Sequence, residues 1–177
     1  WRLVETAWDL GINTSLILFD SDNEQLLSRD RRKAVTSARP ALNGYQRGRC
    51  FYCYRRVEII SGSADLADVD HVFPHVLQRR NFMEGLDQVW NLVLACADCN
   101  RGPRGKFDAV PHSTYINRLN TRNNYLIETH HPLADTLKNQ TGKTPELRRV
   151  FLQAKLDQAS QYQPSVWSTQ PQGYPAF

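Results

Sequence analysis

The sequence predicts an α+β protein in which a small core of strands, braced by a zinc ion, lies between helical flanks. Three observations support this fold class. All four cysteines fall into two Cys-x-x-Cys pairs, strand-like segments lie close to these pairs, and helical periodicity dominates much of the remaining chain. The 177 residues, 41% of them hydrophobic and 23% charged, suit one domain with extensions. This balance excludes a wholly disordered chain.

The order of these patterns divides the chain into four segments. We expect a helical N-terminal flank, the zinc-braced core, a helical C-terminal region and an irregular tail rich in Gln, Pro and Ser; these are residues 1–44, 45–108, 109–162 and 163–177. The first residue is Trp, and initiator Met is normally removed only before small residues. We therefore expect a fragment or a processed form of a longer protein.

Periodicity and helix breakers locate the elements. Helices are expected over residues 2–10, 25–37, 114–129 and 144–162, whereas 15–19 is apolar but ambiguous between helix and strand. The last helix has the clearest start, because Thr144 is a preferred N-cap and Pro145 suits the first helical position. Strands are expected over 56–60, 67–73 and 91–95, the first two joined through Ser61-Gly62-Ser63, with a further helix beginning near Asn100.

The two cysteine pairs predict a structural zinc site. The pairs are Cys50-Phe-Tyr-Cys53 and Cys96-Ala-Asp-Cys99, and 42 residues separate them. Two thiolates three positions apart can bind one tetrahedral Zn²⁺ from a single turn, and two such turns complete a four-cysteine site with no open position. Two disulfides would need an oxidising compartment, and a thioredoxin-like redox motif would need one pair, not two. The zinc would join the two ends of an inserted element.

The charge distribution is compatible with a nucleic-acid partner. Residues 1–28 hold one basic and five acidic side chains, so residues 29–177 carry a net charge of +8 out of the total of +4. Many basic proteins bind no nucleic acid, so charge alone decides nothing. No apolar run reaches the length of a membrane span and no signal peptide opens the sequence. We expect a cytoplasmic protein.

The residues between and just after the cysteine pairs suit phosphodiester hydrolysis. This reaction needs a nucleophilic water, a base and a cation that neutralises charge on the phosphate. Asp70 and Asn100 offer hard oxygen ligands for Mg²⁺ or Mn²⁺. His71 can accept a proton from water near neutral pH. The basic residues beyond the last cysteine would hold the flanking phosphates; these are Arg101, Arg104 and Lys106.

The pattern over residues 45–108 resembles the HNH endonucleases, also called ββα-metal or His-Me finger nucleases. It consists of Cys-x-x-Cys, then Asp70-His71-x-x-Pro74, then Asn91-Leu92, then Cys-x-x-Cys followed by Asn100. The resemblance is to the zinc-braced branch. The third motif position, often His, is Asn100 here, as in junction-resolving phage endonucleases and RNA-guided effectors with HNH domains.

The resemblance implies two strands and a helix around one catalytic metal. It makes His71 the general base, Asp70 and Asn100 metal ligands, and Asn91 the residue that orients the loop and the base. It further implies nicking of DNA with 5′-phosphate and 3′-hydroxyl products. The family also suggests a nuclease part of a larger protein or of a restriction or antiviral defence complex, with a fused or associated sensor, ATPase or guide-binding module.

Other candidates have two interpretations each. His75 is either a partner or substrate contact of the site or a loop histidine, and Asp68 either bonds within the site or is an exposed carboxylate. Trp90 is interpreted as a core residue. The basic residues Arg79, Arg80 and the cluster 29–33 contact nucleic acid or form solvated faces, and His112, His130 and His131 are expected at the surface or at helix caps.

Three alternative functions remain open. The core is either a nuclease or a non-catalytic, zinc-braced nucleic-acid-binding module. The substrate is DNA, RNA or a branched junction, which no sequence feature distinguishes. In the third alternative, the chain is a non-catalytic subunit of a larger assembly, and the acidic residues 1–28 form its docking face.

Overall fold

The computed structural model describes residues 38–163 and 166–175. The expected helices over 2–10 and 25–37, the ambiguous stretch 15–19, the basic cluster 29–33 and the acidic docking face 1–28 lie outside the described residues. Among the described helices, none combines the length and the apolar character that crossing a membrane would require.

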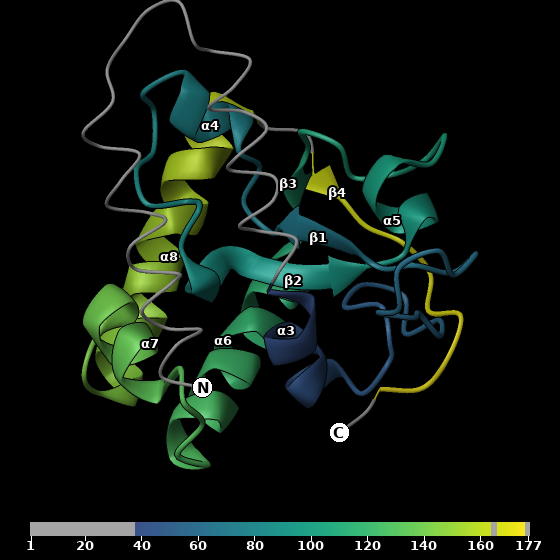
Figure 1. Ribbon diagram of the computed structural model, residues 1–177. Helices are drawn as coiled ribbons and strands as arrows, with labels where there is room; N and C mark the ends of the chain where they lie inside the picture. The colour runs from purple at the N-terminus through teal and green to yellow at the C-terminus, as the bar shows by residue number, and fades with distance from the viewer. Residues whose placement is uncertain (1–37, 164–165, 176–177) are drawn as a thin grey trace, which may run out of the picture.

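A two-stranded antiparallel sheet lies at the centre of the fold (Figure 1). Strand β1 (Asp68–His71) pairs with β2 (Leu92–Ala95), with Asp68 opposite Ala95 and His71 opposite Leu92. All four residues of β2 are buried, as expected for a strand covered on both faces. Helix α5 (Ala97–Arg101) follows β2 after one residue. Leaving aside α4 and η1 between the strands, the chain thus runs from β1 to β2 and then to α5.

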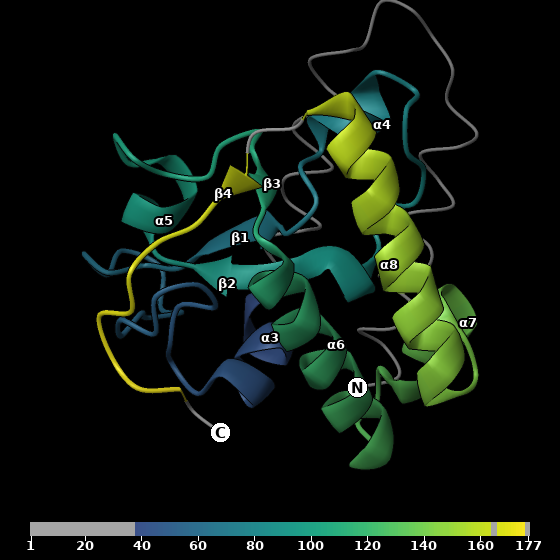
Figure 2. The same ribbon diagram turned by 180° about the vertical axis from the view of Figure 1, so that it is seen from behind.

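The remaining elements surround this sheet. Helix α3 precedes β1, α4 and the 3₁₀ helix η1 connect β1 to β2, and two helices, α6 and α8, with α7 between them, form the C-terminal region (Figures 1 and 2). Their bounds are α3 Arg39–Gln46, α4 Val76–Arg79, η1 Val89–Asn91, α6 Ser113–Glu128, α7 Ala134–Thr141 and α8 Pro145–Tyr162. Short strands β3 (Val110–Pro111) and β4 (Val166–Trp167) pair in parallel.

The predicted strand over 56–60 does not form a ladder with 67–73. It makes only isolated bridges, one between Arg49 and Arg56 and one between Glu58 and Leu66. Its backbone donors are used locally, because Val57 N donates to Gly48 O (2.9 Å) and Glu58 N donates to Asp65 O (2.8 Å). β2, rather than the segment next to it in sequence, is therefore the partner of β1.

One predicted helix begins at a different residue, and two helices of the structure were not predicted. The helix expected near Asn100 begins at Ala97, because Cys96 adopts an extended conformation and serves as its N-cap. Helix α3 was missed because Pro40 was interpreted as a stop, whereas it lies in the first turn, where proline is tolerated. Helix α7 was missed because its eight residues bury only Ala134, Leu137 and Thr141, too few for a clear apolar stripe.

The two long C-terminal helices confirm their predictions closely. The Thr144 side chain accepts a hydrogen bond from Leu147 N (3.3 Å), and Pro145 opens α8. The tail predicted to be irregular contributes β4, which places Trp167 against two core tyrosines. The Trp167 ring centroid lies 5.1 Å from that of Tyr52 and 5.7 Å from that of Tyr115.

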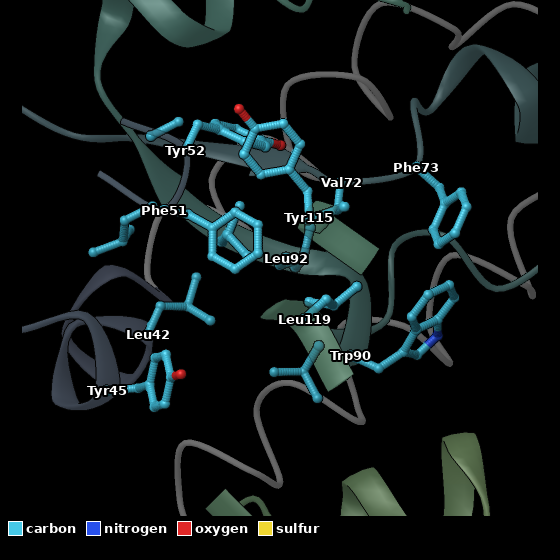
Figure 3. Packing of buried hydrophobic residues seen from close by; sticks show 14 of the residues in the cluster. Leu42, Tyr45, Phe51, Tyr52, Val72, Phe73, Trp90, Leu92, Tyr115 and Leu119 are labelled. Carbon is cyan, nitrogen blue, oxygen red and sulfur yellow. The ribbon is translucent and has the colours of Figure 1, made fainter. Parts of the chain in front are cut away.

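One hydrophobic cluster joins the cysteine-bearing segments, the sheet and the C-terminal helices (Figure 3). Phe51 and Tyr52 from the first cysteine pair, Leu92 from β2, and Tyr115 and Leu119 from α6 all belong to it. The buried guanidinium of α6 Arg122 donates to the carbonyl oxygens of Val89, Trp90 and Leu92, and burial lowers its pKa to about 10. The C-terminal region thus supports the turn that leads into β2.

Candidate active site and zinc centre

The four cysteines form one buried cluster. The sulfurs of Cys50, Cys53, Cys96 and Cys99 all lie within 4.8 Å of one another. The Sγ atoms of Cys53 and Cys96 are 3.8 Å apart, which matches the edge of about 3.8 Å that four sulfurs at roughly 2.3 Å from a tetrahedral zinc would define. The four thiols fit a closed zinc site.

The cysteine cluster is hydrogen-bonded directly to the sheet and to two of the site candidates. Phe51 N, inside the first cysteine pair, donates to Leu94 O of β2 (2.8 Å). Beyond the second pair, Lys106 N donates to Cys99 O (2.7 Å) and Asn100 N donates to Cys96 O (3.0 Å). Binding of a metal by the cysteines would therefore fix the position of Asn100 relative to β1.

A pocket of about 260 Å³ opens at one end of the sheet. It brings together Asp70 and His71 from β1 and Asn100 from α5, all three of which were singled out from the sequence. His75 and Arg101 also line it, as do four residues that carry no predicted role in catalysis: Val69, Pro74, Phe107 and Asp108. The pocket therefore gathers an acid, a base and an amide from two segments that are distant in sequence.

Two buried side chains hold Asp70 from the interior of the protein. Its Oδ2 accepts a hydrogen bond from Tyr52 OH (2.5 Å) and lies 3.4 Å from Lys106 Nζ. Burial and the negative charge of Asp70 raise the pKa of Tyr52, so this hydroxyl remains a donor. Tyr52 lies within the first cysteine pair, so it links the cysteine cluster to the carboxylate.

Lys106 does not occupy the surface position that the sequence analysis expected. It is 1% exposed, and its ammonium donates to the carbonyl oxygens of His71 (2.9 Å) and Phe107 (3.2 Å). An ammonium surrounded in this way faces Asp70 rather than solvent. The prediction that Lys106 contacts a phosphate is therefore wrong for this structure, because the chain turns inward after Gly105.

Asn100 is oriented by Asp68. Asn100 Nδ2 donates to Asp68 Oδ2 (3.1 Å), and the same oxygen accepts from Arg101 Nε (2.8 Å). Asp68 thus bonds within the site, which was one of its two interpretations. Among the described residues, the hydrogen bonds of Asp70 and Asn100 use Oδ2 and Nδ2. Each side chain keeps one oxygen without a protein partner there, and this pair of oxygens is a donor set that suits a hard divalent cation.

Asp87 is the residue of the site that sequence reasoning missed. His71 Nε2 lies 3.0 Å from Asp87 Oδ1, and His75 Nε2 lies 3.3 Å from the same oxygen. The other oxygen, Oδ2, accepts from Gln78 Nε2 (2.8 Å). Burial raises the pKa of Asp87, but the hydrogen bond with His71 and the interaction with His75 outweigh it and hold the pKa well below its usual range. His75 therefore adjoins the site.

Asn91 joins the two segments that carry His71 and Asp87. Its Oδ1 accepts from Phe73 N (2.8 Å), and its Nδ2 donates to Phe73 O (3.0 Å) and Leu86 O (2.9 Å). Phe73 lies two residues after His71, and Leu86 immediately precedes Asp87. These three bonds connect the segment after β1 to the loop that carries Asp87.

The other basic candidates are dispersed. Arg79 and Arg80 are both exposed at the end of α4, with the Arg80 guanidinium 5.6 Å from the centre of the Tyr162 ring. Arg104 is exposed in the loop after α5, and its carbonyl accepts from Trp167 Nε1 (2.9 Å). Of the five basic residues expected to contact nucleic acid, only Arg101 lines the pocket.

The remaining aromatic and histidine candidates lie outside the pocket. Trp90 is fully buried, which confirms its interpretation as core. His112 is the N-cap of α6, where its Nδ1 accepts from Thr114 N (3.3 Å), and His131 Nδ1 accepts from Leu133 N (3.2 Å). His130 is exposed in the turn that follows α6.

Comparison with known proteins gave a family match for the central part of the chain. No curated protein and no solved structure gave a significant match to the chain. Residues 50–103, however, match the family model described as HNH endonuclease. The matched segment starts at the first zinc-ligand candidate and contains all four cysteines, the β1–β2 sheet and Asn100. The chain therefore contains, over residues 50–103, an HNH endonuclease domain.

Proposed function

We propose that this chain is a metal-dependent endonuclease that hydrolyses DNA phosphodiester bonds. The observation that carries the proposal is the pocket shared by Asp70, His71 and Asn100, three residues of the matched HNH segment. An HNH domain implies a nuclease-type function on nucleic acid. DNA as the substrate, the catalytic Mg²⁺ or Mn²⁺ and the roles of individual residues are parts of the proposal.

His71 is the general base of the proposed reaction. It accepts the proton of the water that attacks phosphorus, as a histidine imidazole does in general-base catalysis. Its side chain is 19% exposed, so it is partly enclosed yet reaches the pocket. Asn91 and Asp87 hold the segments around it.

Asp70 and Asn100 would hold the catalytic cation through the oxygens that have no protein partner among the described residues. When bound, Mg²⁺ or Mn²⁺ supplies positive charge to the phosphate and to the departing 3′ oxygen. Arg101, exposed beside the pocket, adds a further positive charge where the phosphate backbone would approach. The resulting products carry 5′-phosphate and 3′-hydroxyl ends.

One pocket cuts one strand, so the expected product is a nick. Supercoiled plasmid incubated with the full chain and Mg²⁺ should yield nicked circles before linear DNA, and EDTA should abolish the reaction. DNA ligase should reseal these nicks, because it requires 5′-phosphate and 3′-hydroxyl ends. Binding without cleavage in either Mg²⁺ or Mn²⁺ would identify a non-catalytic nucleic-acid-binding module instead.

Substrate preference is tested in the same assay, and the larger context is tested by co-purification. RNA and branched junctions presented beside duplex DNA determine which is cleaved fastest, and a clear preference for either would replace DNA in the proposal. We further propose that the domain serves as the nuclease part of a larger protein or defence complex. Co-purification of a tagged chain with a sensor, ATPase or guide-binding protein tests that part.

A further inference from the structure

We propose that Asp87 is a positioning residue that fixes the ring orientation and the tautomer of His71, leaving Nδ1 as the atom that accepts the proton from water. This inference rests on the proposed nuclease function, because it assigns the base of that reaction to one nitrogen. It concerns a residue that the sequence pattern did not single out.

The contact between the two residues is short and partly enclosed. Asp87 Oδ1 lies 3.0 Å from His71 Nε2, and the exposed fractions of the two side chains are 26% and 19%. A carboxylate with a depressed pKa is ionised at neutral pH and can only accept hydrogen bonds. His71 Nε2 must then carry the proton, and the lone pair of the neutral imidazole lies on Nδ1.

Asp87 is itself held in place from two directions. Gln78 of α4 donates from Nε2 to Asp87 Oδ2 (2.8 Å) and accepts at Oε1 from Leu86 N (2.7 Å). Asn91 donates to Leu86 O, directly before Asp87, and bonds both backbone groups of Phe73. The carboxylate is therefore fixed relative to β1, as a group that selects one tautomer must be.

His75 approaches the same oxygen without making a well-aligned hydrogen bond. Its Nε2 lies 3.3 Å from Asp87 Oδ1, and the ring centres of His71 and His75 are 5.2 Å apart. The better aligned and shorter contact belongs to His71. Asp87 is thus assigned to His71, and His75 is a neighbour that adds positive charge when it is protonated.

The first experiment measures the tautomer directly. Long-range ¹H–¹⁵N correlation spectra of the ¹⁵N-labelled chain, recorded at mildly alkaline pH without added divalent cation, should show His71 with Nε2 protonated and Nδ1 unprotonated. The His71 signals are identified by their loss in His71→Gln. A parent protein with Nδ1 protonated would overturn the proposal without any variant being needed, and this result does not depend on nuclease activity.

The second experiment uses three variants. Asp87→Asn should convert His71 to a mixture of tautomers and lower kcat by about 10²-fold or more with little change in KM, as loss of an oriented base does. Asp87→Glu, which keeps the carboxylate, should recover part of both the tautomer and the rate. Asp135→Asn makes the same chemical change on exposed α7, where the Asp135 side chain is 90% exposed, and should alter neither.

The outcomes separate the two proposals. A single Nε2-protonated tautomer and parental kcat in Asp87→Asn would overturn the role of Asp87 while leaving the nuclease function intact. A parent chain with the expected tautomer that cleaves no DNA, RNA or junction would instead overturn the proposed function. Zinc content measured on each variant verifies that its core is folded.

Discussion

The ammonium of Lys106 lies 3.4 Å from the carboxylate of Asp70 and 2.9 Å from the carbonyl oxygen of His71. Both residues of the Asp70-His71 motif are thus contacted by one buried cation. The Lys106 side chain is 0% exposed and that of Asp70 is 8% exposed, so the pair is removed from water. Lys106 balances the charge of the carboxylate from the protein side, and Asp70 also lines the pocket.

Lys106→Met should destabilise the fold strongly. Removal of one partner leaves Asp70 as an uncompensated buried charge and the His71 carbonyl without its donor, which typically costs about 3–5 kcal/mol. The free energy of unfolding, measured in denaturant with zinc present, tests this. Lys138→Met removes the exposed pair with Asp135, which is worth no more than about 1 kcal/mol. Equal losses in the two variants would contradict a buried Lys106–Asp70 pair.

Sequence reasoning found candidate residues whose type and spacing are distinctive, but it did not predict the direction in which side chains point. The cysteine pairs, Asp70 and His71 were singled out because metal binding and the proposed catalysis would use those residue types at that spacing, and Asn91 because of the resemblance to the HNH pattern. Lys106 carries a charge in a stretch rich in arginine and glycine, and nothing in the sequence shows that it turns inward. Asp87 lies 16 residues from His71 in a loop without periodicity, so only the fold brings the two together.

The secondary structure likewise divides into features that local sequence marks and features that depend on contacts between distant segments. Helix α8 was predicted correctly because Thr144 and Pro145 mark its start chemically. The partner of β1 was not identified, because residues 56–60 alternate as a strand would, and only long-range pairing shows that β1 pairs with β2 instead. The parallel pairing of β3 with β4 is likewise a contact between distant segments, which local patterns do not encode.

Cys96→Ser should release the structural metal and loosen the core. Structural zinc supplies folding free energy outright, and Cys96 lies between β2 and α5, at the N-cap position of the helix. The variant should lose stoichiometric zinc in elemental analysis and unfold at lower denaturant concentration. A chelator should do the same to the parent, and added Zn²⁺ should reverse it. Parent protein purified without chelators that contains no stoichiometric zinc would contradict the assignment.

His71→Ala should separate binding from catalysis. The change removes the proposed base but none of the proposed metal ligands, so DNA affinity should hold while cleavage falls by roughly 10²–10⁴-fold. Affinity measured by fluorescence anisotropy and plasmid nicking measured in parallel provide the test. The matched control is His112→Ala, since His112 caps α6 outside the pocket and its loss should leave cleavage unchanged. Unchanged nicking in His71→Ala would place the base on another residue.

Asn100→Ala should weaken the catalytic metal site while leaving the zinc in place. Asp68 holds the Asn100 amide nitrogen at 3.1 Å, so the amide oxygen is the atom available to a cation. A neutral amide oxygen beside one carboxylate makes a weak, hard-cation site, and we expect activity with Mg²⁺ and Mn²⁺ but little with Zn²⁺ alone. The variant should need more Mg²⁺ for half-maximal cleavage and should cleave more slowly at saturation.

Two further changes at this position separate a metal ligand from a helix residue. Asn100→His, the commoner residue in the family that the sequence resembles, should keep measurable activity and shift preference towards Mn²⁺ or Ni²⁺, which accept imidazole readily. Asp68→Asn should raise the Mg²⁺ requirement less than Asn100→Ala does, because it frees the amide to rotate without removing its oxygen. If Asn100 is a ligand, Mn²⁺ affinity measured by electron paramagnetic resonance should fall less in Asp68→Asn than in Asn100→Ala. Parental cleavage by Asn100→Ala at every Mg²⁺ concentration would reduce Asn100 to a structural residue of α5, and the second ligand would then be sought at Asp68 or His75.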